Sequence, residues 1–177
     1  MWLRFKIRFI MALTTNAIGD IGEMYVSIRL TENGLFQTIL LGGKVPSYDI
    51  IAEIIPANNY EKPYQFLIQV KSTSDIQPFT VNAHRLKTPV PKVKYDALVY
   101  RPLPSYIAGV DLNTNNVYLV PAFDRNASYG GSIPTSFCLI PGDPHNIAKL
   151  QRLKNDVINY WHGLNIDVYK PNFASTL

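Results

Sequence analysis

The sequence predicts an α+β (α/β) fold with a mixed central β-sheet flanked by an N-terminal and a C-terminal helix. Two observations lead to this prediction. Apolar residues follow helical spacing near both ends of the chain, and short segments between them alternate as strands do. The apolar fraction of 47% and the charged fraction of 17% are typical of a folded globular chain. A length of 177 residues allows one domain with its own core.

The first residues of the chain alternate between apolar and basic side chains over Leu3–Phe9. No continuous apolar stretch of signal-peptide or membrane-spanning length is present there. We expect a strand or an ordered arm over residues 1–15 and a single domain over residues 16–177. Because Cys138 is the only cysteine, no disulfide can form within the chain, and a cytoplasmic location without membrane association is expected.

The N-terminal helix is predicted over Asn16–Asn33. Asn16 can cap its first turn, and Asn33 followed by Gly34 is a frequent helix stop. The apolar residues follow helical spacing and also extend around the helix, so we expect it to be largely buried. Glu23 lies among these apolar neighbours, where a carboxylate indicates either an ion pair or a functional site.

Strands are predicted over Leu35–Leu41, Tyr48–Ile55 and Tyr64–Ser72, with a hairpin loop between the second and the third. The proline-rich stretch Pro78–Pro104 is expected to contain irregular loops. Further strands are predicted over Asp96–Tyr100, Tyr106–Leu112 and Asn116–Val120. A terminal amphipathic helix is predicted over Asn146–Trp161.

Polar side chains share one face of the second and third strands. Because side chains alternate along a strand, Asp49 lies on the same face as Glu53, and Gln69 on the same face as Lys71. In a symmetric hairpin Asp49 would lie across from Gln69 or Lys71, although a one-residue slip would reverse the facing. Carboxylate and amide oxygens suit Mg²⁺, and an ammonium group can position water and offset charge on a phosphate. The pattern therefore indicates phosphodiester hydrolysis.

The order of these residues resembles that of the PD-(D/E)XK, or restriction-endonuclease-like, nuclease superfamily. The likeness rests on Gly22-Glu23 in a helix, Tyr48-Asp49 at a strand and Gln69-Val70-Lys71-Ser72 in the next strand, within residues 16–74. It is similar to the pattern of archaeal Holliday-junction resolvases. The glutamine variant looks like the catalytic domain of type IV restriction enzymes. The resemblance implies a restriction-endonuclease-like core.

The resemblance also implies the roles of the site residues. Glu23, Asp49, Gln69 and the backbone carbonyl of Val70 would bind Mg²⁺ or Mn²⁺, and Lys71 would act in catalysis. Gln69 stands where the family usually has an acid, which lowers the negative charge of the site. The expected activity is Mg²⁺-dependent hydrolysis of DNA phosphodiester bonds by an endodeoxyribonuclease. A homodimer is expected because cutting both strands of a duplex usually needs two sites.

A basic stretch supplies candidate contacts to DNA phosphates at His84, Arg85, Lys87, Lys92 and Lys94. A solvated loop is the alternative interpretation of this stretch. The net charge of +4 suits a nucleic-acid partner but is common in other proteins. Two further hypotheses remain open. One is a catalytically weak or inactive nuclease fold that binds DNA or joins a complex, and the other is a structural α+β domain.

Overall fold

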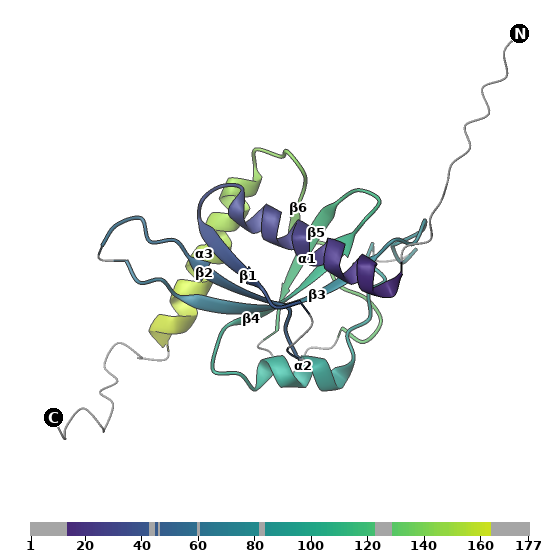
Figure 1. The fold of residues 1–177 in the computed structure, drawn as a ribbon, viewed down its shortest axis with the longest axis horizontal. Coiled ribbons are helices and arrows are strands. Elements are labelled where there is room, and N and C mark those ends of the chain that lie inside the picture. The colour runs from purple at the N-terminus through teal and green to yellow at the C-terminus, as the bar shows by residue number, and fades with distance from the viewer. Residues whose placement is uncertain are drawn as a thin grey trace, which may run out of the picture.

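The computed structural model of the chain describes residues 14–42, 45, 47–59, 61–81, 84–122 and 129–163. The expected N-terminal strand or arm, residues 1–15, falls almost entirely outside these ranges. Within them the chain forms an α+β fold with one six-stranded mixed sheet and three helices, as the predicted fold class requires (Figure 1).

The elements follow in the order helix, three strands, helix, three strands, helix. The helices are α1 (Thr15–Thr31), α2 (Lys92–Val99) and α3 (Asn146–Gly163). The strands are β1 (Phe36–Leu40), β2 (Ile50–Ile54), β3 (Gln65–Thr73), β4 (Ser105–Asp111), β5 (Asn116–Pro121) and β6 (Cys138–Leu139). They lie side by side in sequence order. Only β3 and β4 are parallel, because the connection through α2 returns the chain to the starting end of β3.

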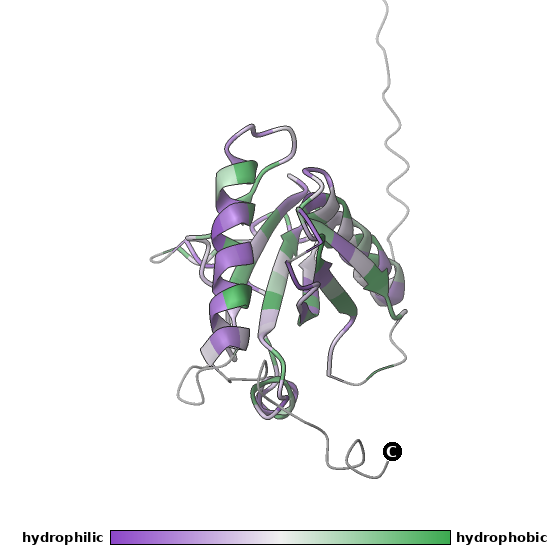
Figure 2. Ribbon diagram, turned by 90° about the vertical axis from the view of Figure 1, so that its left-hand side faces the viewer, coloured by the Kyte–Doolittle hydropathy of each residue, from purple (hydrophilic) through white to green (hydrophobic). Residues whose placement is uncertain are grey.

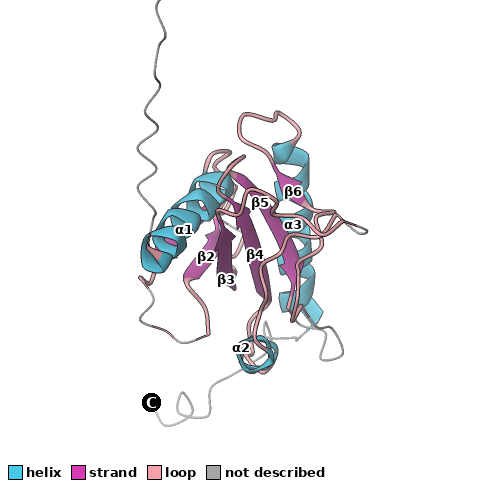
Figure 3. Cartoon of the chain, turned by 90° about the vertical axis from the view of Figure 1, so that its right-hand side faces the viewer, coloured by secondary structure: helices cyan, strands magenta, loops and turns pink. Residues whose placement is uncertain are grey.

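Different helices cover the two faces of the sheet. Residues of α1 and α3, among them Val26 and Leu150, are buried in one apolar core with the strands. On the other face α2 packs through Tyr95 and Leu98 against Ile107 of β4. Figure 3 shows α2 lying apart from both α1 and α3.

The predicted alternation along β2 and β3 is confirmed. The even-numbered apolar residues of both strands are buried in the core beneath α1 and α3, so the odd-numbered residues face the α2 side. The register pairs Ile50 with Ile68. Asp49, directly before β2, and Gln69, within β3, therefore lie beside each other.

The predicted strand over Asp96–Tyr100 is wrong, because most of this segment belongs to α2. Pro91 occupies the N-cap position, where its missing N–H leaves no helical hydrogen bond unmade. Tyr95 and Leu98, three residues apart, are buried on the same side of the helix. Tyr95 and Leu98 thus form the inner side of a short helix within the proline-rich stretch that was expected to be irregular.

The first helix differs from its prediction in two respects. Its cap is Thr14 and not Asn16, since the Thr14 Oγ1 accepts a hydrogen bond from the Ala17 N–H at 3.2 Å. It is also less buried than expected. Met24 and Ile28, one turn apart, are 55% and 45% exposed because only one side of α1 meets the sheet.

The terminal helix α3 is amphipathic, as predicted. Leu150, Leu153 and Val157 are buried, whereas Ile147, which was predicted on the same apolar face, is exposed. The outward side of α3 is mostly hydrophilic (Figure 2). No helix in the described ranges has both the length and the apolar character that crossing a bilayer requires.

Gly22 is the point at which α1 touches β3. A Cβ atom on Gly22 would lie 1.7 Å from Ser72 Oγ and 2.9 Å from Ser72 Cβ, and real side chains do not approach so closely. A glycine therefore lets the two backbones meet. Because Glu23 is the next residue, this contact also sets where its side chain meets the sheet.

We predict that Gly22→Ala lowers the free energy of unfolding by about 1–3 kcal/mol, since the added methyl group overpacks the contact with Ser72. Gly19→Ala is the matched control in the same helix, because a Cβ there meets no atom within 4 Å. That control should stabilise the protein by about 0.5–1 kcal/mol. Urea unfolding measures both, and equal effects would contradict docking through Gly22.

Candidate active site

Asp49 lies directly before β2, where β2 and β3 stop pairing. Its own N–H still donates to the Ile68 carbonyl at 2.9 Å. Its Oδ2 accepts the backbone N–H of Val70 at 2.7 Å, so the carboxylate takes the place of the missing strand partner. The position of the Asp49 carboxylate is therefore fixed by the backbone of β3.

Gln69 lies next to Asp49 and is only 2% exposed. Its Nε2 donates to Asp49 Oδ2, and to the Val70 carbonyl at 3.3 Å. Its Oε1 is buried and has no hydrogen-bond partner. A buried amide oxygen without a partner is costly unless a donor or a cation satisfies it. This oxygen is thus chemically suited to bind a cation.

The backbone carbonyl of Val70 points to the same end of the sheet. In an extended strand the N–H and C=O groups of one residue face the same side. The Val70 N–H bonds to Asp49 and its carbonyl accepts from Gln69, so both groups face these two side chains. The structure therefore brings the predicted carbonyl ligand together with the two predicted side-chain ligands.

Lys71 lies on the same face of β3 as Gln69 and close to two charged groups. Burial lowers the pKa of its ammonium group, the positive charge of Lys94 lowers it further, and Asp49 raises it. Lys94 belongs to the first turn of α2 and also lowers the pKa of Asp49. The site thus contains two ammonium groups, one from β3 and one from α2.

Opposing effects act on the pKa of the Asp49 carboxyl group. Burial raises its pKa above the ordinary value and is the largest effect. The Val70 N–H, the charges of Lys71 and Lys94, and the Gln69 amide all lower the pKa without cancelling that rise. Asp49 is accordingly a part-buried carboxylate whose ionised form a positive partner stabilises.

Glu23 reaches this end of the sheet from α1. Burial raises its pKa to about 7, and the negative charges of Asp49 and Asp20 contribute to the rise. The influence of Asp49 means that the two carboxylates lie near each other. Their mutual repulsion is what a bound cation relieves.

The available donors fit a hard divalent cation. Two are the carboxylates of Glu23 and Asp49, and two are neutral oxygens from Gln69 and Val70. Among the described residues, no three His, Cys, Asp or Glu side chains gather closely enough to hold a metal ion by themselves. Mg²⁺ commonly uses only one or two carboxylates and completes its coordination with water and phosphate oxygens.

The basic residues predicted to contact DNA lie in two parts of the fold. Lys94 faces the site, as its influence on Asp49 and Lys71 indicates. Lys92, in the same helix, is exposed and pairs with Asp96 at 2.8 Å.

The other three lie in the connection between β3 and α2. Arg85 donates from Nε and Nη2 to the hydroxyl and the carbonyl of Ser132, both at 2.8 Å. Lys87 Nζ donates to the Gln77 carbonyl at 2.7 Å. His84 is exposed and has a left-handed backbone with φ of 44°. Arg85 and Lys87 thus hold this connection in place.

Arg101, just after α2, is a neighbour of the site that the sequence did not reveal. It contacts Ser47 and Tyr48, the two residues before Asp49. It follows Asp49 by about fifty residues in a segment where we expected loops and strands, so no local pattern pointed to it.

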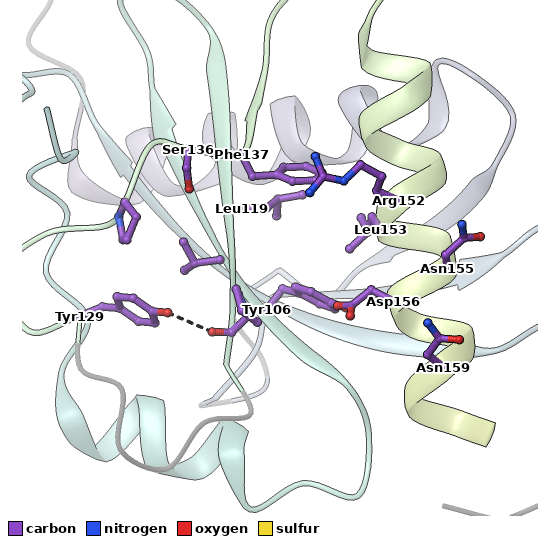
Figure 4. Close-up of a pocket in the computed structure, with 13 residues that line it drawn as sticks. Tyr106, Leu119, Tyr129, Ser136, Phe137, Arg152, Leu153, Asn155, Asp156 and Asn159 are labelled. Atoms are coloured by element: carbon purple, nitrogen blue, oxygen red, sulfur yellow. Dashed lines mark hydrogen bonds between the residues drawn. The ribbon is translucent and has the colours of Figure 1, made fainter. Parts of the chain in front are cut away.

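A cavity of about 640 Å³ lies elsewhere, between α3 and the strands β4 and β5 (Figure 4). Tyr106 and Phe137 contribute aromatic walls, and Arg152 extends from α3 beside them. The Tyr106 hydroxyl donates to Asp156 Oδ2 at 2.6 Å. No residue of the predicted site lines this cavity, so the cavity is separate from the carboxylates.

We predict that Glu23→Gln makes unfolding less favourable above neutral pH. A carboxyl group whose folded-state pKa is about 7, against an ordinary 4.5, stabilises the fold while protonated and loses that contribution as the pH rises through 7. At about pH 8 the free energy of unfolding of the variant should exceed that of the wild type by about 1 kcal/mol. The difference is no larger because solvent screens a part-exposed group. The difference should vanish as the pH falls below 4.5. Urea unfolding of both proteins at each pH measures this difference. A difference that does not change with pH would show that the raised pKa of Glu23 is not its cause.

Comparison of the chain with protein-family models, with curated proteins and with solved structures finds no match.

Proposed function

We propose that the chain is a Mg²⁺- or Mn²⁺-dependent endodeoxyribonuclease with a restriction-endonuclease-like core. The main support is that Asp49, Gln69 and Lys71 lie together where β2 and β3 part. Glu23 comes to the same place from α1. The helix and the two strands named by the sequence resemblance are thus adjacent in the fold, with the four side chains at one end of it.

Each residue has a role in this proposal. Asp49, Glu23, the Oε1 of Gln69 and the carbonyl of Val70 would hold the cation. When bound, it supplies Lewis-acid chemistry that lowers the pKa of water and offsets charge on the phosphate. In its neutral amine form, which the lowered pKa favours, Lys71 would orient the attacking water and take its proton.

Lys94 supplies a second positive charge to the site. Because its ammonium group enters from α2, it can contact a phosphate oxygen while Lys71 faces the water. Positive groups at this position stabilise the negative charge that develops during phosphodiester cleavage. We propose DNA as the substrate and a homodimer as the form that cuts both strands.

One observation favours a second candidate function. The Gln69 amide donates to Asp49, so these two side chains satisfy part of each other's polar groups without a cation. An acid at position 69 would not do so. The fold could therefore act as a catalytically weak or inactive module that binds DNA or joins a complex.

Cleavage of supercoiled plasmid with Mg²⁺ or Mn²⁺ tests the first candidate. Asp49→Ala and Lys71→Ala should each lower the rate by about 100-fold or more, because one removes a metal ligand and the other the proton acceptor. Glu53→Ala is the control from the same strand face, since Glu53 bonds to Gln37 and Gln65 at the far end of β2. Absence of cleavage with any divalent metal would refute the enzyme and leave the binding module and the structural domain. Full activity of Asp49→Ala would show that the site lies elsewhere.

Gln69→Glu separates a metal site from a purely structural pair. The substitution replaces an amide donor by a second carboxylate against Asp49, so the metal-free variant should have a lower melting temperature than the wild type. Mn²⁺ should restore the melting temperature if the two side chains share a cation. A lower melting temperature that Mn²⁺ does not raise would contradict the proposed ligand set.

A further inference from the structure

We infer that Arg101 is a positioning residue for Asp49. It acts through the two residues that precede the carboxylate, and we call Arg101 with Ser47 and Tyr48 the Arg101 clamp. The effect of the Arg101 clamp on metal binding rests on the proposed function. The effect of the clamp on the position of the Asp49 side chain does not depend on that function.

Two contacts define the clamp. Arg101 Nη2 donates to Ser47 Oγ at 3.2 Å, and its guanidinium carbon lies 5.5 Å from the centre of the Tyr48 ring. A guanidinium group at this distance from an aromatic face is attracted to it. One side chain thus holds two consecutive residues, by a hydrogen bond and by a cation–π contact.

Both sides of the clamp are anchored in the fold. Ser47 is only 3% exposed, and Tyr48 packs against the apolar cluster beneath α2 that includes Leu98. The Arg101 N–H donates to the Leu98 carbonyl at 3.0 Å, which continues the last turn of α2. The clamp therefore connects the end of α2 to the segment that leads into Asp49.

Asp49 needs such an anchor because it precedes β2. The ladder between β2 and β3 ends at the pair Ile50–Ile68, so the residues before Asp49 have no strand partner on β3. The Asp49 carboxylate must nevertheless reach the Val70 N–H to within hydrogen-bonding distance. Fixing the two preceding residues limits the backbone angles from which this bond forms.

The α2 region thereby supplies two different positive groups. Lys94, in its first turn, acts on the site by charge, whereas Arg101, after its last turn, contacts the side chains of the two residues before Asp49. A displacement of α2 would move both together. Metal binding through Asp49 should then depend on Arg101, although Arg101 does not touch the carboxylate.

Hydrogen exchange at the Val70 amide tests the clamp without any metal or substrate. This N–H has Asp49 Oδ2 as its acceptor, so its protection reports the position of the carboxylate. In Arg101→Ala its exchange should be about tenfold faster or more, while the amide of Ala108 in the middle of the sheet keeps its protection. Ser47→Ala, which removes only the hydrogen bond, should give a smaller acceleration.

Two further variants sharpen the comparison. Arg101→Lys should recover part of the protection, because an ammonium group keeps the cation–π contact but lacks the planar fork of a guanidinium group. Arg152→Ala removes an exposed arginine of α3 that lines the separate cavity, and it should leave Val70 unchanged. Unchanged Val70 exchange in Arg101→Ala overturns the inference. Equal acceleration at Val70 and Ala108 also overturns it, because that result means general destabilisation.

Plasmid cleavage supplies the functional readout. In Arg101→Ala the Mn²⁺ concentration for half-maximal rate should rise about tenfold, with the KM for DNA unchanged, because only ligand placement is altered. A change in the KM alone would contradict a role through Asp49. If the wild type cuts no DNA, the proposed function fails, but the exchange at Val70 still decides whether Arg101 positions Asp49.

Discussion

At the end of the β2–β3 ladder, β3 continues without a partner on the side where β2 has ended. A buried backbone N–H in such a place has to find another acceptor. The N–H of Val70 finds it in the carboxylate of Asp49, and the amide of Gln69 bonds to the same oxygen. This hydrogen bond fixes the Asp49 carboxylate, one ligand of the proposed site, against the backbone of β3.

Helices on opposite faces of the sheet bring charge to this point. From one face α1 supplies Glu23. The contact between Gly22 and β3 sets how closely α1 approaches the sheet at this residue. From the other face α2 supplies Lys94, which acts on Asp49 together with Lys71. Two carboxylates and two ammonium groups are thus held in a part-buried place where charges interact more strongly than in water. This balance suits a reaction that needs both a cation and a phosphate to be bound.

Gln69 is neutral at the position where the resemblance of the sequence implies an acid, which lowers the negative charge of the proposed site. The amide satisfies Asp49 by donating to it, and its own oxygen is left buried and without a partner. An acid at position 69 would add a third carboxylate to those of Glu23 and Asp49, and a cation would have to relieve the increased repulsion. The glutamine therefore lets the site fold without metal while keeping an oxygen available, which is why the structure is compatible with both an enzyme and a binding module.

The sequence alone determined which residues share a face. Alternation put Asp49 with Glu53 on one face of β2 and Gln69 with Lys71 on one face of β3, because the period of a strand is local and visible in the residue order. The register that places Asp49 beside Gln69 came only from the structure. Tertiary structure decided the rest. The α2 helix was mistaken for a strand, since a short apolar segment suits either element until its packing partner is known. The nearness of Lys94 and Arg101 to Asp49 depends on the return of the chain through α2 to the parallel strand β4. Such contacts join segments far apart in the chain, and no local pattern records them.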